Sequence, residues 1–170
     1  MAVVAIKSKA ITNRDASPKV INDAAYAKGA LKSFVGQCAV TSGNDIASKY
    51  FFGQIPSNAI VHSLLVSSSA DAGTTTTGHL GLWKKTADDG TAGVVVDADF
   101  FKATLLLNGG ALTDAEHANG NVITLALSEK KIWELLGLSS DPNLIYDVIL
   151  QLDAACDGTA VVQVKCIYAE

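Results

Sequence analysis

The chain has 170 residues, of which 49% are apolar and 18% charged, and its formal net charge is −4. This length and apolar content suffice for one domain with its own hydrophobic core, without a metal or disulfide to support it. The acidic balance and the lack of a Lys/Arg-rich run argue against nucleic acid as a partner, and no apolar stretch approaches the roughly 20 residues that cross a membrane.

Residues 1–30 differ from the rest of the chain. They have no sustained strand or helix period, and several turn-forming residues interrupt them. This pattern predicts an extended N-terminal arm ahead of a domain over residues 31–170. Such an arm can be free, lie across its own domain or lie on a neighbour, and its β-branched residues argue against a purely solvated tail. The expected contact residues are Ile6, Ile11, Asn13, Arg14, Val20 and Ile21.

From Leu31 onward, short apolar or alternating segments lie between turn signals, which is typical of β-strands. Residues 59–66 carry apolar groups on both faces, which predicts a strand in the middle of a sheet, with His62 on its more apolar face. The last two segments alternate most clearly and are predicted to form a hairpin through residues 154–158. The expected strands cover residues 31–40, 49–55, 59–66, 79–83, 94–96, 144–152 and 159–168.

Two short helices are predicted between these strands. Asp97 is placed to cap a helix over residues 98–103. Ser128 is placed to cap a second helix over residues 129–136, with Gly137 as its C-terminal stop. Because neither helix could connect parallel strands in repeated βαβ units, the sequence predicts an all-β fold. The expected architecture is an antiparallel β-sandwich of jelly-roll type with two short helices and an extended N-terminal arm.

A search for catalytic patterns finds no constellation of reactive residues. The histidines form no H-x-H pair, and neither a G-x-S-x-G elbow nor a phosphate-binding glycine loop is present. Asp97 and Asp99 form a D-x-D, but helix capping explains both, and Asp88-Asp89-Gly90 is typical of a turn. We therefore expect no enzymatic activity, no bound metal and no cofactor. The three histidines are His62, His79 and His117.

The cysteines point to reduced thiols. No C-x-x-C pair occurs among the three cysteines, which are Cys38, Cys156 and Cys166. An odd number of cysteines cannot all form disulfides within one chain. We expect free, buried thiols in a protein made in the cytoplasm.

Much of the sequence resembles capsid cement, or decoration, proteins of short-tailed bacteriophages. The segments that carry this resemblance are AITNRDASPKVIN, KYFFGQIPSNAIVHSLLVSSSADAGTTTTGHLGLWKK, VVDADFFKATLLLNGGAL and IWELLGLSSDPNLIYDVILQLDAA. The resemblance implies a jelly-roll protein without catalytic residues, made in the host cytoplasm and located on the outer capsid surface of the virion. Its implied partners are the major capsid protein and further copies of itself, as a dimer or trimer.

The alternative is a carbohydrate- or receptor-binding jelly-roll module of a phage fibre or tail. Such a site presents exposed aromatic rings beside polar groups. Trp83 is the candidate platform because Lys84, Lys85 and the Asp88-Asp89 turn follow it. The low aromatic content, 6%, argues against this alternative.

Overall fold

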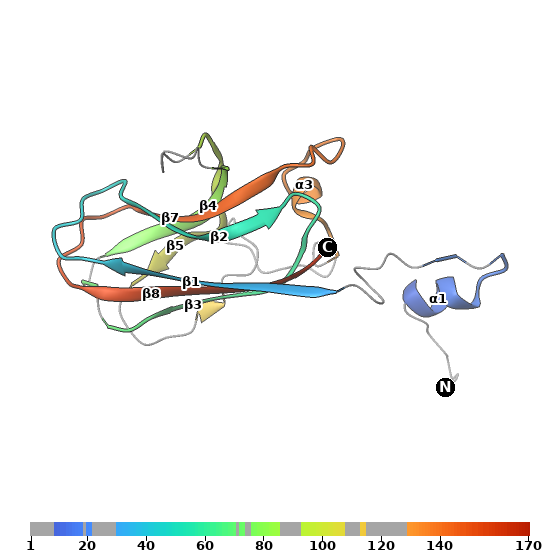
Figure 1. Ribbon diagram of the computed structural model, residues 1–170, viewed down its shortest axis with the longest axis horizontal. Coiled ribbons are helices and arrows are strands. Elements are labelled where there is room, and N and C mark those ends of the chain that lie inside the picture. Colours follow the sequence, from blue (N-terminus) through green and yellow to red (C-terminus); the bar gives the residue numbers. More distant parts are fainter. Residues whose placement is uncertain are drawn as a thin grey trace, which may run out of the picture.

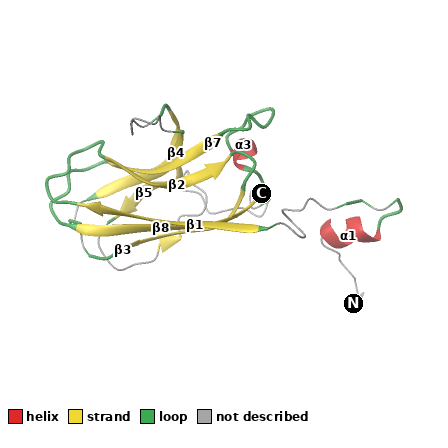
Figure 2. Ribbon diagram, in the orientation of Figure 1, coloured by secondary structure: helices red, strands yellow, loops and turns green. Residues whose placement is uncertain are grey.

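The computed structural model describes residues 9–18, 20–21, 30–70, 72–73, 76–85, 93–107, 113–114 and 129–170. Within these ranges the strands form two four-stranded antiparallel sheets that lie face to face (Figures 1 and 2). Sheet A contains β1 (Leu31–Val40), β8 (Ala160–Ala169), β3 (Ile60–Ser68) and β6 (Thr113–Asp114), in that order. Sheet B contains β2 (Lys49–Pro56), β7 (Ile145–Leu152), β4 (Thr77–Lys84) and β5 (Val95–Leu106), in that order. The predicted all-β sandwich is confirmed.

Between successive strands of the described part, the chain crosses from one sheet to the other at every connection except the one from β4 to β5. This winding matches the paired Greek keys of a jelly roll. The predicted hairpin of the last two strands is wrong, because β7 lies in sheet B and β8 in sheet A. Both strands bury alternate residues in the same core, and such alternation alone does not distinguish a hairpin from a connection between sheets.

The hydrophobic core lies between the inner faces of the two sheets. It takes alternate residues from each long strand, as the patterns of the last two strands predicted. From β7 these residues are Tyr146, Val148, Leu150 and Leu152, and from β8 they are Val162, Val164 and Cys166. β3 lies between β8 and β6, so its predicted place inside a sheet is confirmed.

The two sheets meet closely where edge strand β1 passes edge strand β2. A Cβ atom added at Gly36 would lie 2.0 Å from the carbonyl oxygen of Phe52. One added at Gly53 would meet the Phe34 ring at 2.5 Å, and the Cys38 thiol donates to the Phe51 carbonyl at 3.2 Å. Only glycine allows the two backbones to approach this closely at Gly36.

The helix predicted over residues 98–103 is wrong, because this segment belongs to β5. It pairs with β4 through a register that shifts several times. The shifts allow the adjacent rings of Phe100 and Phe101 to reach the core together, in an edge-to-face contact with centroids 4.9 Å apart. Pairing and aromatic burial outweigh a local capping signal.

The second predicted helix is shorter than expected. It is α3 (Ile132–Leu135), which begins after Lys131 rather than Ser128, a residue outside the described ranges. The Glu134 carboxylate accepts the Lys131 N–H at 2.9 Å, and Gly137 ends the helical segment with φ 70°, as predicted.

The buried Ser57 links the turn between β2 and β3 to α3 and to the segment after it. Its carbonyl accepts the Trp133 N–H at 3.0 Å. Its hydroxyl donates to Asp141 Oδ1 at 2.5 Å and accepts the Leu144 N–H at 3.1 Å. These contacts position the segment that leads into β7.

The N-terminal segment contains a helix that the sequence did not predict, α1 (Lys9–Asp15). It lies beyond one end of the sandwich, away from both sheets (Figure 1). Its seven residues form fewer than two turns of apolar periodicity, too few to stand out in the sequence. Among the described residues, no helix is long and apolar enough to cross a membrane.

The substitution Gly36→Ala tests the close approach of β1 and β2. We expect it to lower the free energy of unfolding by about 2–3 kcal/mol, because a backbone carbonyl cannot move aside. Gly53→Ala should cost less, because the Phe34 ring can move. Urea denaturation of both variants measures the difference, and an equal or smaller loss for Gly36→Ala would contradict the contact.

Candidate functional site

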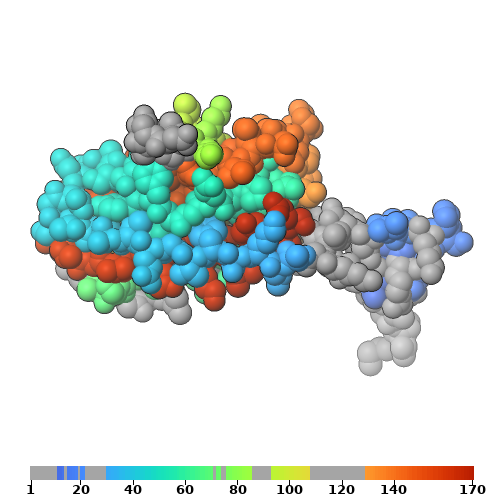
Figure 3. All heavy atoms as spheres, in the orientation of Figure 1, coloured from blue at the N-terminus to red at the C-terminus, as the bar shows by residue number. Residues whose placement is uncertain are grey.

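The residues predicted to bind a partner lie mostly on the segment around α1. Val20 and Ile21 are 50% and 93% exposed, whereas Ile11 and Asn13 are partly buried. The Asn13 carbonyl accepts the Ala16 and Val20 N–H groups, each at 3.3 Å, which turns the chain after α1. Ile6 and the side chain of Arg14 lie outside the described part. In the space-filling view the blue residues of this segment stand clear of the sandwich (Figure 3).

A second surface is the outer face of sheet A. The pairing of β1 with β8 places Leu31, Val35 and Val161 on this face, and these side chains are 66%, 56% and 42% exposed. Gln37 and Gln163 form a cross-strand hydrogen bond at 3.1 Å. Lys165 is the single charged side chain that β1, β8 and β3 contribute to this face. The part of the face that these three strands form is nearly uncharged and has exposed aliphatic groups, which suits a protein partner.

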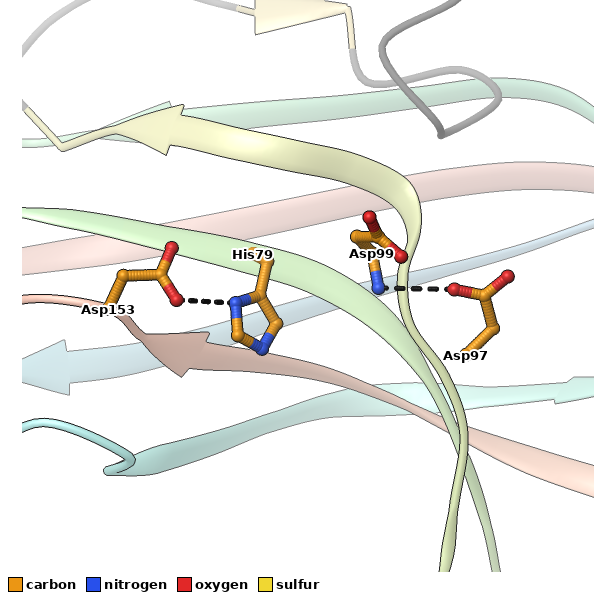
Figure 4. Close-up of polar contacts among 4 residues, drawn as sticks. All are labelled: His79, Asp97, Asp99 and Asp153. Atoms are coloured by element: carbon orange, nitrogen blue, oxygen red, sulfur yellow. Dashed lines mark hydrogen bonds and ion pairs between the residues drawn. The ribbon is translucent and has the colours of Figure 1, made fainter.

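The fold also brings together two residues that sequence reasoning did not connect. His79 on β4 and Asp153, just after β7, form a pair with Nδ1 and Oδ1 2.5 Å apart (Figure 4). Within the described residues, no hydrogen bond joins the His79 ring or the Asp153 carboxylate to the side chain of a serine, threonine or cysteine. No described group of three His, Cys, Asp or Glu side chains could hold a metal ion. The pair joins β4 to the segment that follows β7, the strand beside it in sheet B.

Asp97 and Asp99 lie close together on β5 (Figure 4), where Asp97 Oδ1 accepts the Asp99 N–H at 3.3 Å. Partial burial raises the pKa of the Asp97 carboxyl, and the neighbouring Asp99 raises it further. The two carboxyls thus do not act as a helix cap, which was the sequence-based explanation.

Two expectations about exposure are wrong. His62 is exposed, because the pairing of β3 with β8 shifts between Val61 and Ser63 and turns His62 away from the core. Trp83 is only 1% exposed, so its ring cannot serve as the sugar-stacking platform of the alternative function. His117 and the Asp88-Asp89 turn lie outside the described residues.

All three cysteines are free thiols, as predicted. Cys156 and Cys166 are buried and Cys38 is partly buried. Burial raises the pKa of the Cys38 thiol, which keeps it protonated and poorly nucleophilic at neutral pH.

Comparison with known proteins identifies solved structures with a similar fold. No protein-family model matches the sequence, and no curated protein matches it. A chain in the capsid structure of Ralstonia phage GP4 has a TM-score of 0.55 at 10% identity, with 84% of this chain and 85% of that chain covered. A chain in the capsid asymmetric unit of cyanophage Pam1 has a TM-score of 0.50 at 16% identity, with 91% and 96% covered. This chain shares their fold.

The raised pKa of Asp97 gives a prediction with a defined sign. Because the folded-state pKa lies above the unfolded one, protonated Asp97 stabilises the fold, and this contribution is lost as pH rises through the folded pKa. Asp97→Asn keeps an oxygen that can accept the Asp99 N–H. It should raise the free energy of unfolding at pH 7 by about 0.5 kcal/mol, a value limited by solvent screening. The gain should vanish below about pH 4.

Asp141 provides a control because its pKa shift has the opposite sign to that of Asp97. Hydrogen bonds from the Ser57 hydroxyl and the Asn143 N–H hold the pKa of Asp141 below its usual value. Its stabilising contribution is therefore present above the unfolded pKa and lost as pH falls through the folded pKa. Asp141→Asn should destabilise the protein at pH 7 and have less effect in acid. Urea unfolding of both variants across this pH range measures the two trends, and trends of the same sign would contradict the assignment.

Proposed function

We propose that this chain is a structural protein of a bacteriophage virion that binds the outside of the capsid and stabilises contacts between major capsid protein subunits. The observation that carries the proposal is the fold shared with chains of two phage capsid structures, over at least 84% of this chain and 85% of each of theirs. The resemblance of the sequence to capsid cement proteins supports the same role.

The N-terminal arm is one proposed means by which this chain attaches to the capsid. We infer that residues 1–30 form a separate arm and residues 31–170 the folded domain, since β1 begins at Leu31 and α1 lies beyond the sandwich. The arm would contact a capsid subunit through Ile6, Ile11, Asn13, Arg14, Val20 and Ile21. The strongest support among these residues comes from Ile21, whose aliphatic side chain is almost fully exposed.

The outer face of sheet A offers a second means of attachment. Leu31 is the first residue of β1 and lies on this face, so the face includes the residue at which the domain begins. A nearly uncharged surface can be covered with little cost of desolvating charges. Many such contacts repeated over a shell stabilise it through avidity, even where each one is weak.

Binding to shells tests the proposal directly. The full chain should co-sediment with empty expanded shells of the phage that encodes it and should raise their melting temperature. Val35→Asp places a charge on the outer face of sheet A and should weaken shell binding by about tenfold or more. Leu106→Asp, at a comparably exposed position on β5, is the matched control and should bind normally. Failure of the full chain to bind shells would overturn the proposal.

Deletion of residues 2–25 tests the arm. The shortened chain should keep the far-ultraviolet circular dichroism and the thermal melting of the folded domain, because the core lies within residues 31–170. It should bind shells more weakly than the full chain. An unfolded product would show that these residues belong to the core, and unchanged shell binding would remove the arm from the attachment.

A further inference from the structure

A groove with an apolar floor lies at the end of sheet B where β4 finishes and β7 begins. It is lined by Lys84, Lys85, Asn143, Leu144 and Ile145. Leu144 and Ile145 are 42% and 49% exposed, so their side chains offer aliphatic surface to a partner. No ion pair to either lysine is seen within the described part of the chain.

The same region has further exposed aliphatic groups at its rim. Lys84 donates its N–H to the Val94 carbonyl at 2.9 Å, and Val95 pairs with Trp83. Val94 and Val95 are therefore close to the groove, and they are 68% and 51% exposed. An occupant that suits this surface combines an aliphatic side chain with a negative charge.

Two candidate occupants from the chain itself can be compared, because each exposes an isoleucine. Ile21 belongs to residues 1–30, which contain four lysines, one arginine and two aspartates, so lysines in the groove would repel this segment. Ile46 is 61% exposed and follows Asp45, in a loop over residues 41–48 that contains no basic residue. Charge complementarity therefore favours the loop over residues 41–48, rather than residues 1–30, as the occupant of the groove.

Hydrogen bonds fix the loop over residues 41–48 at several points. The Asn44 side-chain oxygen accepts the Thr41 N–H at 2.7 Å. The Asp45 carboxylate accepts the Ile46 N–H at 2.7 Å, and Ala47 donates its N–H to the Leu152 carbonyl at 2.9 Å. Ala47 has φ 68°, a costly conformation for a residue other than glycine. An ordered loop loses little conformational entropy on binding.

The loop of one molecule cannot reach its own groove. Ala47 is hydrogen-bonded to Leu152 at the end of β7, whereas Leu144 and Ile145 lie at its beginning. The eight residues of β7 separate the two sites by about 25 Å. Figure 1 shows the loop at the end of the sandwich opposite the arm. Any contact between loop and groove therefore joins two molecules.

We propose that the loop over residues 41–48 of one copy docks into this groove of a second copy. Ile46 packs on Leu144 and Ile145, and the Asp45 carboxylate pairs with the ammonium group of Lys84 or Lys85. The contact is heterologous, so it generates a ring if the rotation closes and a chain of copies if it does not. It is small, so copies associate weakly in solution and more fully when they are concentrated on a surface.

Sedimentation velocity on the full chain over a range of concentrations tests this contact. The wild type should self-associate as its concentration rises toward about 1 mM, and added salt should weaken the association. Ile46→Asp and the double variant Lys84→Glu/Lys85→Glu should each weaken it by about tenfold or more. Leu106→Asp, at a similarly exposed aliphatic position, is the matched control and should associate like the wild type.

A charge reversal distinguishes the proposed pair from a general loss of solubility or charge. Asp45→Lys combined with Lys84→Glu/Lys85→Glu should associate more strongly than the lysine double variant alone. Circular dichroism and thermal melting verify that each variant is folded. A wild type that stays monomeric throughout, or folded Ile46→Asp that associates normally, would overturn the proposal. Shell binding is measured separately, so its failure and the failure of this contact are distinguishable.

Discussion

The packing of the inner face of sheet A against the inner face of sheet B is the interaction on which the rest of this structure depends. The chain crosses between the sheets at nearly every connection, so successive strands are held together by the shared core and not by pairing with each other. Most strand pairs join segments far apart in the sequence, as β1 and β8 do. The two sheets are therefore expected to fold and unfold together as one cooperative unit. A substitution at Gly36 would affect both of them.

The outer faces of the two sheets differ in how far their apolar side chains are buried. On sheet B, Trp83 and Ile149 are buried although they point away from the main core. The β5 backbone comes so close to Gly81 that a Cβ there would meet the Asp97 carbonyl oxygen at 2.2 Å. Sheet A instead leaves aliphatic groups of β1 and β8 open to solvent. The outer face of sheet A is open only in part, because Ile60 and Ala169, which the strand pairing places beside Leu31 on this face, are each 1% exposed.

The two proposed contacts, attachment to a capsid and self-association, involve different parts of the molecule. The nearly uncharged outer surface of β1, β8 and β3 and the basic arm suit contact with a larger partner. The loop over residues 41–48 and the groove at Lys84 and Lys85 lie at opposite ends of sheet B and carry opposite charges. A protein that binds a repeating lattice gains from both, because contacts between neighbours add to contacts with the lattice without requiring tight binding at either.

The sequence by itself determined that the chain is all-β, which residues of β7 and β8 enter the core, and where β1, β2 and β3 lie. These features follow from local alternation and turn residues, which act over a few positions. Tertiary structure alone decided that residues 98–103 form a strand, that β7 and β8 separate into different sheets, and that a register shift exposes His62. It also paired His79 with Asp153 and placed Ile46 and the groove at opposite ends of β7. Each of these outcomes depends on backbone pairing or side-chain contact between segments distant in the chain, and such contacts outweigh local preferences when they bury apolar surface.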